Sequence, residues 1–477
     1  MILDRHSIAA TLFFLLAVAV PDCPAFEDDH SPSPLTDDEI SAMSAISEGR
    51  VLSTVSFLSS DEMAGRDTPS AEFDIACSYV AARFRGAGLE SLGDDKSYYQ
   101  LHELQMIQAP DAPAEVKIQS DQSSLSLPLL LTGNKAVDVQ GKVMSEDEAL
   151  AADNPSIASI DEIKTSFRGG SSVSSVLAIC ERRISALKKK GVRVVLMKCD
   201  IAGPIYASAE ALHDQPQTVR GEISNDCSVV LYSTKQQLIG KEVQVRIDPM
   251  RRVKRPIRNV VGVLRGSDGD LKESAIVVTA HLDHIGKTER GKDRVNNGAD
   301  DNATGVTAVL SLADAISKLK SRPKRSIVFA TFWGEEQGMK GSKQFVANPP
   351  WPLANIHANI NIEMVGRPEK NAQNKAWMTG WRHSNLGEVM NAGSKRVDVE
   401  IFNRTDVGEM LYSRSDNISF VQKGVIAHSF SAGSLHSDYH QPSDEWSKLD
   451  IPHMTQVIRG LYAGILHVAE TPLERTD

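Results

Sequence analysis

Hydrophobic and polar positions follow two different periods along this chain. Near the start, apolar residues recur at helical spacing in VLSTVSFLSS and in FDIACSYVAARFRGAGL, with the loop DEMAGRDTPS between them. Later, β-like runs begin near Ser326, His357 and Val425 and alternate with helical segments. Strands that alternate with helices predict a three-layer α/β/α sandwich. The helix expected over residues 306–319 has one apolar face, as a helix that covers a sheet requires; its members are Val306, Val309, Leu310, Ala313 and Ile316.

The middle of the chain breaks this alternation. Residues 106–250 contain many short β-like runs, such as LPLLLTG, and one helix, SSVLAICERRISALKKKG, that leads into VRVVLMKCD. We therefore predict a smaller α+β domain inserted between residues 40–105 and residues 251–472, which together form the main domain. A chain of 477 residues exceeds one typical core, which agrees with two folded units.

The first 25 residues read as a secretory signal. They have a weakly basic start, a short apolar run and small residues before a possible cut after Ala25. The apolar run over residues 8–20 is well short of the roughly 20 residues that a membrane span needs. We expect an exported protein, secreted or periplasmic, with no stable membrane span after cleavage. Residues 26–39, rich in Pro, Ser and Asp, are expected to form a mobile lead-in.

Composition and cysteine spacing narrow the classes of molecule and of metal site that this protein is expected to have. The net charge of −10 argues against nucleic acid or an anionic membrane surface as the main partner. After cleavage four cysteines remain, and none lies in a C-x-x-C spacing, which disfavours a cysteine zinc site. Neither disulfide pairing nor oligomeric state follows from the sequence. The four cysteines are Cys77, Cys180, Cys199 and Cys227.

Metal-ligand residue types lie where the expected strands end, which is where open α/β sheets build their sites. In chain order they are His281, Asp301, Glu336, Glu363 and His440. Imidazole and carboxylate donors of this kind suit zinc. By itself a strand-end histidine is more often a hydrogen-bonded structural residue, and two glutamates at a helix start are common. The set as a whole indicates a metallohydrolase.

Two residues near these candidate ligands, Asp283 and Glu335, have carboxylates that can act at the same site. Asp283 follows His281 by two positions, so on an extended chain it faces the same side and can orient the imidazole. Glu335 and Glu336 end the run SIVFATFW, and adjacent residues of an extended chain point to opposite sides. One of the two carboxylates can then bind a metal while the other reaches a bound water.

Five local sequences resemble the zinc-dependent exopeptidase family that includes bacterial aminopeptidases, glutamate carboxypeptidase, glutaminyl cyclases and the catalytically silent transferrin receptor. They are AIVVTAHLDHIG, NNGADDNATGV, SIVFATFWGEEQGMKGS, ANINIEMVGR and SLHSDYHQPSDEWSKLD, and the resemblance extends upstream to about Ile40. It implies that family's α/β/α fold with a mixed sheet. Residues 106–250 look like its protease-associated insert, and Arg66, in the family's opening, is expected to make a structural salt bridge.

The resemblance also implies two zinc ions per chain. One would be bound by His281, Asp301 and Glu363, and the other by Asp301, Glu336 and His440, with Asp301 shared. Glu335 is implied as the general base that later acts as acid. In relatives the peptide bond after the shared Asp is cis, so strain is expected at Asp301-Asn302.

Some assignments stay open at this level. Asp300 competes with Asp301, and His436 competes with His440. Glu363 stands where many relatives have Asp. Ser415-Asp416-Asn417 stands where relatives often have Ser-Asp-His, which puts a substrate-side contact or proton partner in doubt. Tyr439 or a backbone N–H could stabilise the oxyanion.

The function expected from this reading is that of an exported zinc aminopeptidase acting on peptides. A carboxypeptidase of the same family would need a basic pocket, for which Arg367 and Arg414 are candidates. A glutaminyl cyclase uses a similar site with one zinc for aminoacyl transfer and is not expected to carry a long insert. A non-catalytic, receptor-like relative would have lost metal ligands.

Overall fold

The computed structural model describes residues 33–476, except 109, 111, 132–134, 162–181, 201–216, 219–226, 289–290 and 434. The predicted signal sequence, residues 1–25, and Cys180 lie outside the described residues. Within those ranges every helix falls short of the length and apolar character that a membrane crossing demands. Cys77 and Cys227 are buried thiols.

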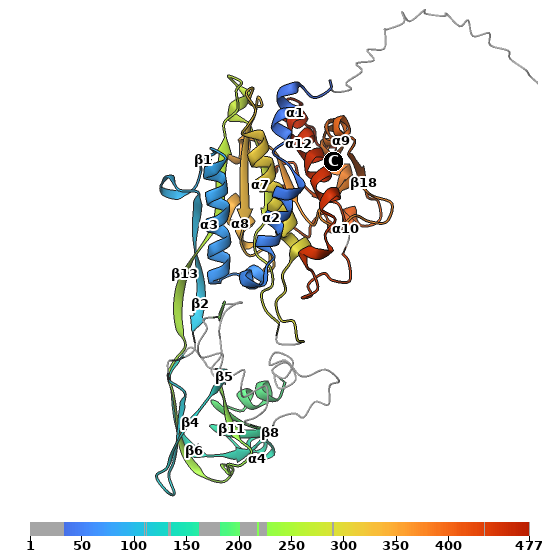
Figure 1. Cartoon of the computed structure of the whole chain (residues 1–477). Coiled ribbons are helices and arrows are strands. Elements are labelled where there is room, and N and C mark those ends of the chain that lie inside the picture. Colours follow the sequence, from blue (N-terminus) through green and yellow to red (C-terminus); the bar gives the residue numbers. More distant parts are fainter. Residues whose placement is uncertain are drawn as a thin grey trace, which may run out of the picture.

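A ten-stranded mixed sheet forms the centre of the larger unit (Figure 1). Its strand order is β10-β2-β13-β15-β14-β16-β19-β17-β18, and β1 pairs with β13. The neighbours β15, β14, β16 and β19 are parallel, so their carboxyl ends meet at one edge. The strands are β1 (Glu90–Ser91), β2 (Tyr99–Gln108), β10 (Gln217–Thr218), β13 (Arg251–Leu264), β14 (Ala275–His281), β15 (Ser326–Phe332), β16 (Ile356–Ile362), β17 (Lys375–Met378), β18 (Glu400–Asn403) and β19 (Ala427–Ser431).

Helices cover both faces of this sheet, because successive side chains on a strand point to opposite faces. On β14, Ile276 and Val278 belong to the apolar cluster under α2, α3, α7 and α12, whereas Val277 belongs to the cluster under α8 and α11. The predicted three-layer α/β/α sandwich with a mixed sheet is therefore confirmed. The helices are α2 (Glu48–Leu58), α3 (Ala71–Gly86), α7 (Gly305–Ile316), α8 (Lys340–Ala347), α9 (Leu386–Ser394), α10 (Gly408–Leu411), α11 (Asn417–Val421) and α12 (Ile451–Val468).

Helix α7 is more deeply placed than its sequence indicates. The sequence predicts one buried face, but all twelve residues from Gly305 to Ile316 are buried. One side of α7 packs on β14, β15 and β16, and α2 and α12 cover another side. Those two helices come from opposite ends of the chain, so the period of residues 306–319 alone could not predict this burial.

The predicted lead-in, residues 26–39, is shorter than expected. Helix α1 (Asp37–Met43) already begins within it. Thr36 caps the helix: its hydroxyl accepts from the Glu39 N–H, and the Glu39 carboxylate accepts from the Thr36 N–H in return. This reciprocal arrangement satisfies two N–H groups that a helix start leaves open.

Between β2 and β13 the chain forms a separate smaller unit, at the far end of the β2–β13 ribbon in Figure 1. One sheet has the order β5-β11-β9-β8-β7 and the other β4-β3-β12-β6. Valines such as Val116, Val194 and Val245 join both sheets in one core. The predicted smaller α+β unit is therefore present. Its elements are β3 (Ala114–Ile118), β4 (Ser124–Leu127), β5 (Leu129–Leu131), β6 (Val137–Lys142), β7 (Met144–Ser145), α4 (Glu146–Ala151), β8 (Ile157–Asp161), β9 (Val194–Cys199), β11 (Ser228–Ser233) and β12 (Glu242–Ile247).

Buried His428 on β19 makes the stability of the main domain depend on pH. Its Nδ1 lies 2.8 Å from the Thr379 carbonyl, to which it donates, and its Nε2 lies 2.8 Å from the Ser384 hydroxyl, from which it accepts. Both ring nitrogens are thus engaged in the neutral form, and burial lowers the pKa of His428 to about 4. The unfolded imidazole titrates near 6.5, so stability is lost as the pH falls from there towards 4.

From pH 7 to pH 5 we expect His428 to account for a loss of about 2 kcal/mol in the free energy of unfolding. Urea denaturation gives the free energy of unfolding of the wild type and of His428→Asn at the two pH values. The wild type should lose about 2 kcal/mol more between pH 7 and pH 5 than His428→Asn loses. Equal pH dependence in both proteins would contradict it.

Candidate metal centre

The candidate ligands gather at the carboxyl edge of the four parallel strands. His281 is the last residue of β14, and Glu363 directly follows β16. His440 lies in the connection that follows β19, and Asp301 lies in an irregular turn, Ala299–Thr304, just before α7. Glu336 lies between β15 and α8. The fold thus brings together all five residues that the sequence indicated.

The glutamate pair is positioned differently from the prediction. Strand β15 ends at Phe332, so Glu335 and Glu336 are not on extended chain. Gly334 has a φ of +64°, a left-handed conformation that glycine adopts without strain, and the chain turns there. Both carboxylates therefore lie on a turn rather than at the end of an extended strand.

The first candidate metal group consists of His281, Asp301 and Glu363. Nε2 of His281 lies 3.3 Å from Oδ1 of Asp301 and 3.3 Å from Oε2 of Glu363. Nδ1 of the same ring lies 3.0 Å from the Asp283 backbone carbonyl, to which it can donate. That bond leaves the Nε2 lone pair free to bind a metal.

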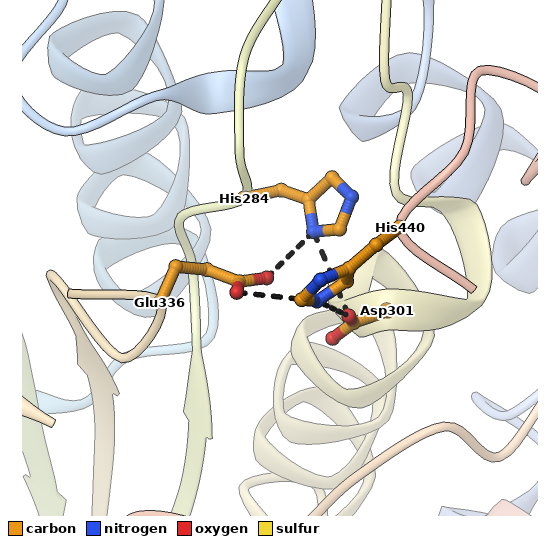
Figure 2. Close-up of side chains that lie close together, drawn as sticks. All are labelled: His284, Asp301, Glu336 and His440. Atoms are coloured by element: carbon orange, nitrogen blue, oxygen red, sulfur yellow. Dashed lines mark hydrogen bonds and ion pairs between the residues drawn. The ribbon is translucent and has the colours of Figure 1, made fainter. Parts of the chain in front are cut away.

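The second group consists of Asp301, Glu336, His440 and a histidine that the sequence did not indicate, His284 (Figure 2). Nε2 of His440 lies 3.1 Å from Oδ2 of Asp301 and 3.2 Å from Oε2 of Glu336. Asp301 contributes one oxygen to each group, as expected of a bridging carboxylate.

Both groups fit zinc. Donors at 2.0–2.1 Å from one tetrahedral ion are about 3.3–3.4 Å apart. The contacts of Asp301 with His281 and His440, at 3.3 Å and 3.1 Å, are close to that separation. In addition, Oδ2 of Asp301 and Nε2 of His440 are buried atoms without a well-formed hydrogen bond to a described residue. Buried polar atoms are rarely left in that state, and a metal ion would satisfy both.

Asp301 is ionised in this arrangement. Burial opposes its charge, but the neighbouring imidazoles of His281, His440 and His284 outweigh that effect and keep the pKa of its carboxyl far below the usual range. The peptide bond between Asp301 and Asn302 is cis, as the resemblance implied.

The two competing candidates, Asp300 and His436, contact each other instead. Nε2 of His436 lies 3.3 Å from Oδ2 of Asp300, and Nδ1 of His436 lies 3.1 Å from the Arg367 guanidinium. Oδ1 of Asp300 accepts from the Gly366 N–H at 2.9 Å. Neither residue belongs to a candidate metal group. They link the turn that carries Asp301 to the connection that carries His440.

Asp283 contacts both His281 and Glu335, but its contact with His281 is not the predicted one. Its carbonyl, rather than its carboxylate, contacts the His281 ring; the nearest carboxylate oxygen lies 3.9 Å from Nδ1. Oδ1 of Asp283 instead accepts from the backbone N–H of Glu335 at 3.1 Å. Burial raises the pKa of Asp283 to about 8. Asp283 therefore fixes the turn that carries Glu335.

Glu335 lies among other acids. Burial, together with the nearby carboxylates of Asp416, Glu363 and Glu336, raises the pKa of Glu335 well above its usual range, although His281 opposes the shift. Asp416 is itself fully buried, and burial raises its pKa to about 7. A carboxylate with a raised pKa has a greater affinity for protons, which suits a general base.

The carboxylate of Glu363 is fixed by two donors. Its Oε1 accepts from Ser415 Oγ at 2.5 Å and from Asn361 Nδ2 at 2.9 Å, which leaves Oε2 for a metal. Asn417, at the position where relatives often have His, accepts from the Ser429 hydroxyl and donates to the Tyr412 carbonyl. Asn417 therefore serves a structural role, away from the candidate metal groups.

The second group is more open to solvent than the first. The His440 side chain is 34% exposed, whereas that of His281 is only 2% exposed. The Tyr439 ring stacks on His440 with centroids 3.9 Å apart. Burial and the surrounding carboxylates raise the pKa of Tyr439, so its phenol keeps its proton and can donate. A substrate would approach from this side.

Arg66 stabilises the chain around the candidate metal groups through hydrogen bonds to backbone carbonyls rather than through the expected salt bridge. Its fully buried guanidinium donates to the backbone carbonyls of Leu58, Leu282, Asn297 and Gly298. Burial lowers the pKa of Arg66 to about 10, and the charges of Asp301 and Asp283 counter that shift. Arg66 therefore remains a cation, and it fixes the segment that follows His281 and the segment that precedes Asp301.

Comparison with known proteins agrees with this geometry. Residues 259–463 match the model of peptidase family M28. A probable glutamate carboxypeptidase of Arthroderma benhamiae is 27% identical over 238 residues, which cover 46% of this chain and 31% of that protein. Leupeptin-inactivating enzyme 1 of Streptomyces exfoliatus is 32% identical over 96 residues, 20% of each chain. These matches span less than a third of the length of either relative.

The fold is shared with a solved structure. The zinc aminopeptidase BSAP of Bacillus subtilis superposes with a TM-score of 0.50 and 15% identity, covering 88% of this chain and 94% of that one. The family match includes Asp301, both candidate glutamates of the turn, Glu363 and His440. In sequence, residues 259–463 therefore resemble peptidase family M28.

Proposed function

We propose that this chain is a zinc aminopeptidase that removes N-terminal residues from peptides. The observation that carries the proposal is the position of Glu335, a half-buried acid beside two candidate metal groups that share Asp301. Hydrolysis of a peptide bond needs an activated water, a polarised carbonyl and a group that moves a proton. The residues at this edge of the sheet can supply all three.

Zinc, when bound, supplies a water whose pKa is near 7 and an electrophile for the carbonyl oxygen. His281 and Glu363 would bind one ion and Glu336 and His440 the other, with Asp301 between them. Glu335 takes the proton of the attacking water and passes it to the leaving amine. Tyr439, a protonated phenol beside His440, can donate to the developing oxyanion.

Charge favours the amino end of a peptide. The centre is lined by the carboxylates of Asp283, Asp301, Glu335, Glu336, Glu363 and Asp416. Acidic side chains complement a substrate ammonium better than a substrate carboxylate. Arg367, one of the two candidates for binding a substrate carboxylate, is already paired with Asp438 at 2.9 Å.

A carboxypeptidase is the second candidate. Arg414 is exposed and directly precedes Ser415, the residue that bonds Glu363. A guanidinium at that position can bind a C-terminal carboxylate. A relative named as a probable glutamate carboxypeptidase matches 46% of the chain. A cyclase with one zinc, or a non-catalytic relative, is less compatible with two candidate groups that share a carboxylate.

Matched chromogenic aminoacyl substrates with free and with acetylated amino termini test the proposal. We expect cleavage only of the free form, loss of that cleavage after chelation and its return with added zinc. C-terminally blocked peptides, and the variant Arg414→Ala, test the carboxypeptidase. Cleavage of acetylated peptides from the carboxyl end, abolished by Arg414→Ala, would replace the aminopeptidase by that second candidate. Export, predicted from residues 1–25 alone, stays a prediction.

A further inference from the structure

His284 has two possible roles beside the second metal group. It could bind the ion through Nδ1, or it could donate a hydrogen bond from Nδ1 to Glu336. Its side chain is fully buried, and Nδ1 lies 2.8 Å from Oε1 of Glu336 and 3.7 Å from Oδ2 of Asp301. These two roles predict different distances and different partners for the rest of the ring.

The distances favour the donor. Two ligands of one tetrahedral zinc are about 3.3–3.4 Å apart, and the contacts of His440 with Asp301 and Glu336, at 3.1 Å and 3.2 Å, are close to this. The 2.8 Å contact of His284 is shorter and is the length of an N–H···O hydrogen bond to a charged oxygen. It also involves the other oxygen of Glu336, Oε1, whereas His440 contacts Oε2.

The far nitrogen of the ring gives a second argument. A metal-binding imidazole almost always donates its other N–H to an acceptor, as Nδ1 of His281 does to the Asp283 carbonyl. Nε2 of His284 is buried and has no hydrogen-bond partner among the described residues. If Nδ1 bound a metal, Nε2 would carry a buried, unsatisfied proton. If Nδ1 donates, Nε2 is an unprotonated nitrogen.

The ring is also fixed in place. A Cβ atom at Gly298 would lie 2.5 Å from Cγ and Cδ2 of His284, so the ring lies directly against the Gly298 backbone. The His440 ring meets it edge-on, with centroids 5.4 Å apart. The direction of Nδ1 towards Glu336 is therefore set before any metal binds.

We infer that His284 is a positioning residue that donates from Nδ1 to Oε1 of Glu336, so that Glu336 offers only Oε2 to the metal. The inference rests on the proposed function only in that it takes the metal to be zinc. The other terminal carboxylate has the same design: Ser415 and Asn361 bind Oε1 of Glu363 and leave Oε2 free. Each group would then supply three protein ligands and leave a bound zinc ion an open coordination position, as in catalytic zinc sites.

Three substitutions at this position separate the two roles. Asparagine places an N–H donor close to the position of Nδ1 but binds zinc poorly. Aspartate is a good zinc ligand but cannot donate, and its charge repels Glu336. Alanine can do neither. Zinc binding is measured by competition with a chromogenic chelator at fixed pH, together with thermal unfolding of each zinc-free protein.

We expect His284→Ala to weaken one of the two zinc equivalents by about 10–100-fold. His284→Asn should restore most of that affinity, and His284→Asp should bind at least as weakly as His284→Ala. Tight binding by His284→Asp together with weak binding by His284→Asn would overturn the inference in favour of a ligand. Unchanged affinity in His284→Ala would also overturn it.

The comparison of asparagine with aspartate remains decisive if the alanine variant does not fold. Peptidase activity is recorded separately for every variant. Wild-type protein that binds two zinc ions and shows the expected variant series, yet cleaves no peptide, would refute the proposed function and leave the inference standing. If the wild type cleaves peptides but the His284 variants do not show the expected order of zinc affinities, the inference is refuted and the proposed function is not.

Discussion

Glu335→Gln is expected to lower kcat by about 10²–10⁴-fold, the usual contribution of a general acid–base group. The amide has nearly the same shape as the carboxylate but cannot accept the proton of the attacking water. Glu335 belongs to neither candidate metal group, so the zinc content should not change. Steady-state kinetics on a free-amino substrate, with zinc counted by atomic absorption, checks both parts.

The neighbouring residue provides the control. Glu336→Gln changes the same chemical group one position along, but it removes a candidate ligand and a contact of His440. It should therefore release one zinc equivalent as well as activity. If Glu335→Gln lost zinc while Glu336→Gln kept it, the two assignments would have to be exchanged. Full activity in Glu335→Gln would exclude it as the base.

Arg66→Met should destabilise the zinc-free protein by at least about 3 kcal/mol, because buried acceptors left unpaired cost about 1–3 kcal/mol each. Four backbone carbonyls lose their donor in this variant. Arg66→Lys should restore little, since an ammonium cannot reproduce the planar fork that reaches all four. The free energy of unfolding, from urea denaturation at neutral pH, measures the effect without a contribution from metal binding.

Arg50→Met is the matched control for this experiment. Arg50 is an arginine of α2 whose side chain is 52% exposed and pairs with Asp314. Exposed ion pairs contribute at most about 1 kcal/mol, so this variant should stay close to the wild type. A loss in Arg66→Met no greater than that in Arg50→Met would contradict the structural role of Arg66.

Local sequence patterns predicted much of the centre, because several candidate ligands stand next to a periodic segment. The apolar run of residues 275–280 and the alternating run of residues 358–362 mark two strand ends, and His281 and Glu363 lie there. The sandwich itself followed from the alternation of strands and helices. The roles of the ligands and the sharing of Asp301 came from the family resemblance rather than from any period.

What the sequence did not predict depends on contacts between distant or irregular segments. His284 stands three positions after His281, a spacing with no meaning on a strand, and it approaches Glu336 only because the chain turns after β14. The expected partner of Arg66 was a carboxylate, whereas its actual partners are backbone carbonyls, which no sequence pattern reveals. A glycine at position 334 was the available signal that the glutamate pair lies on a turn.

The smaller unit is attached to the central sheet where Gln108 of β2 faces Arg251 of β13, and the short strand β10, from the same stretch of chain, pairs with the end of β2. Topologically it is a greatly enlarged hairpin loop, since β2 and β13 would remain partners if the two ends were joined by a short turn. In evolution, such a unit can be gained, lost or exchanged without changing the order or the pairing of the other strands in the central sheet. The hydrolytic centre and its appendage are thus able to diverge at independent rates within one lineage.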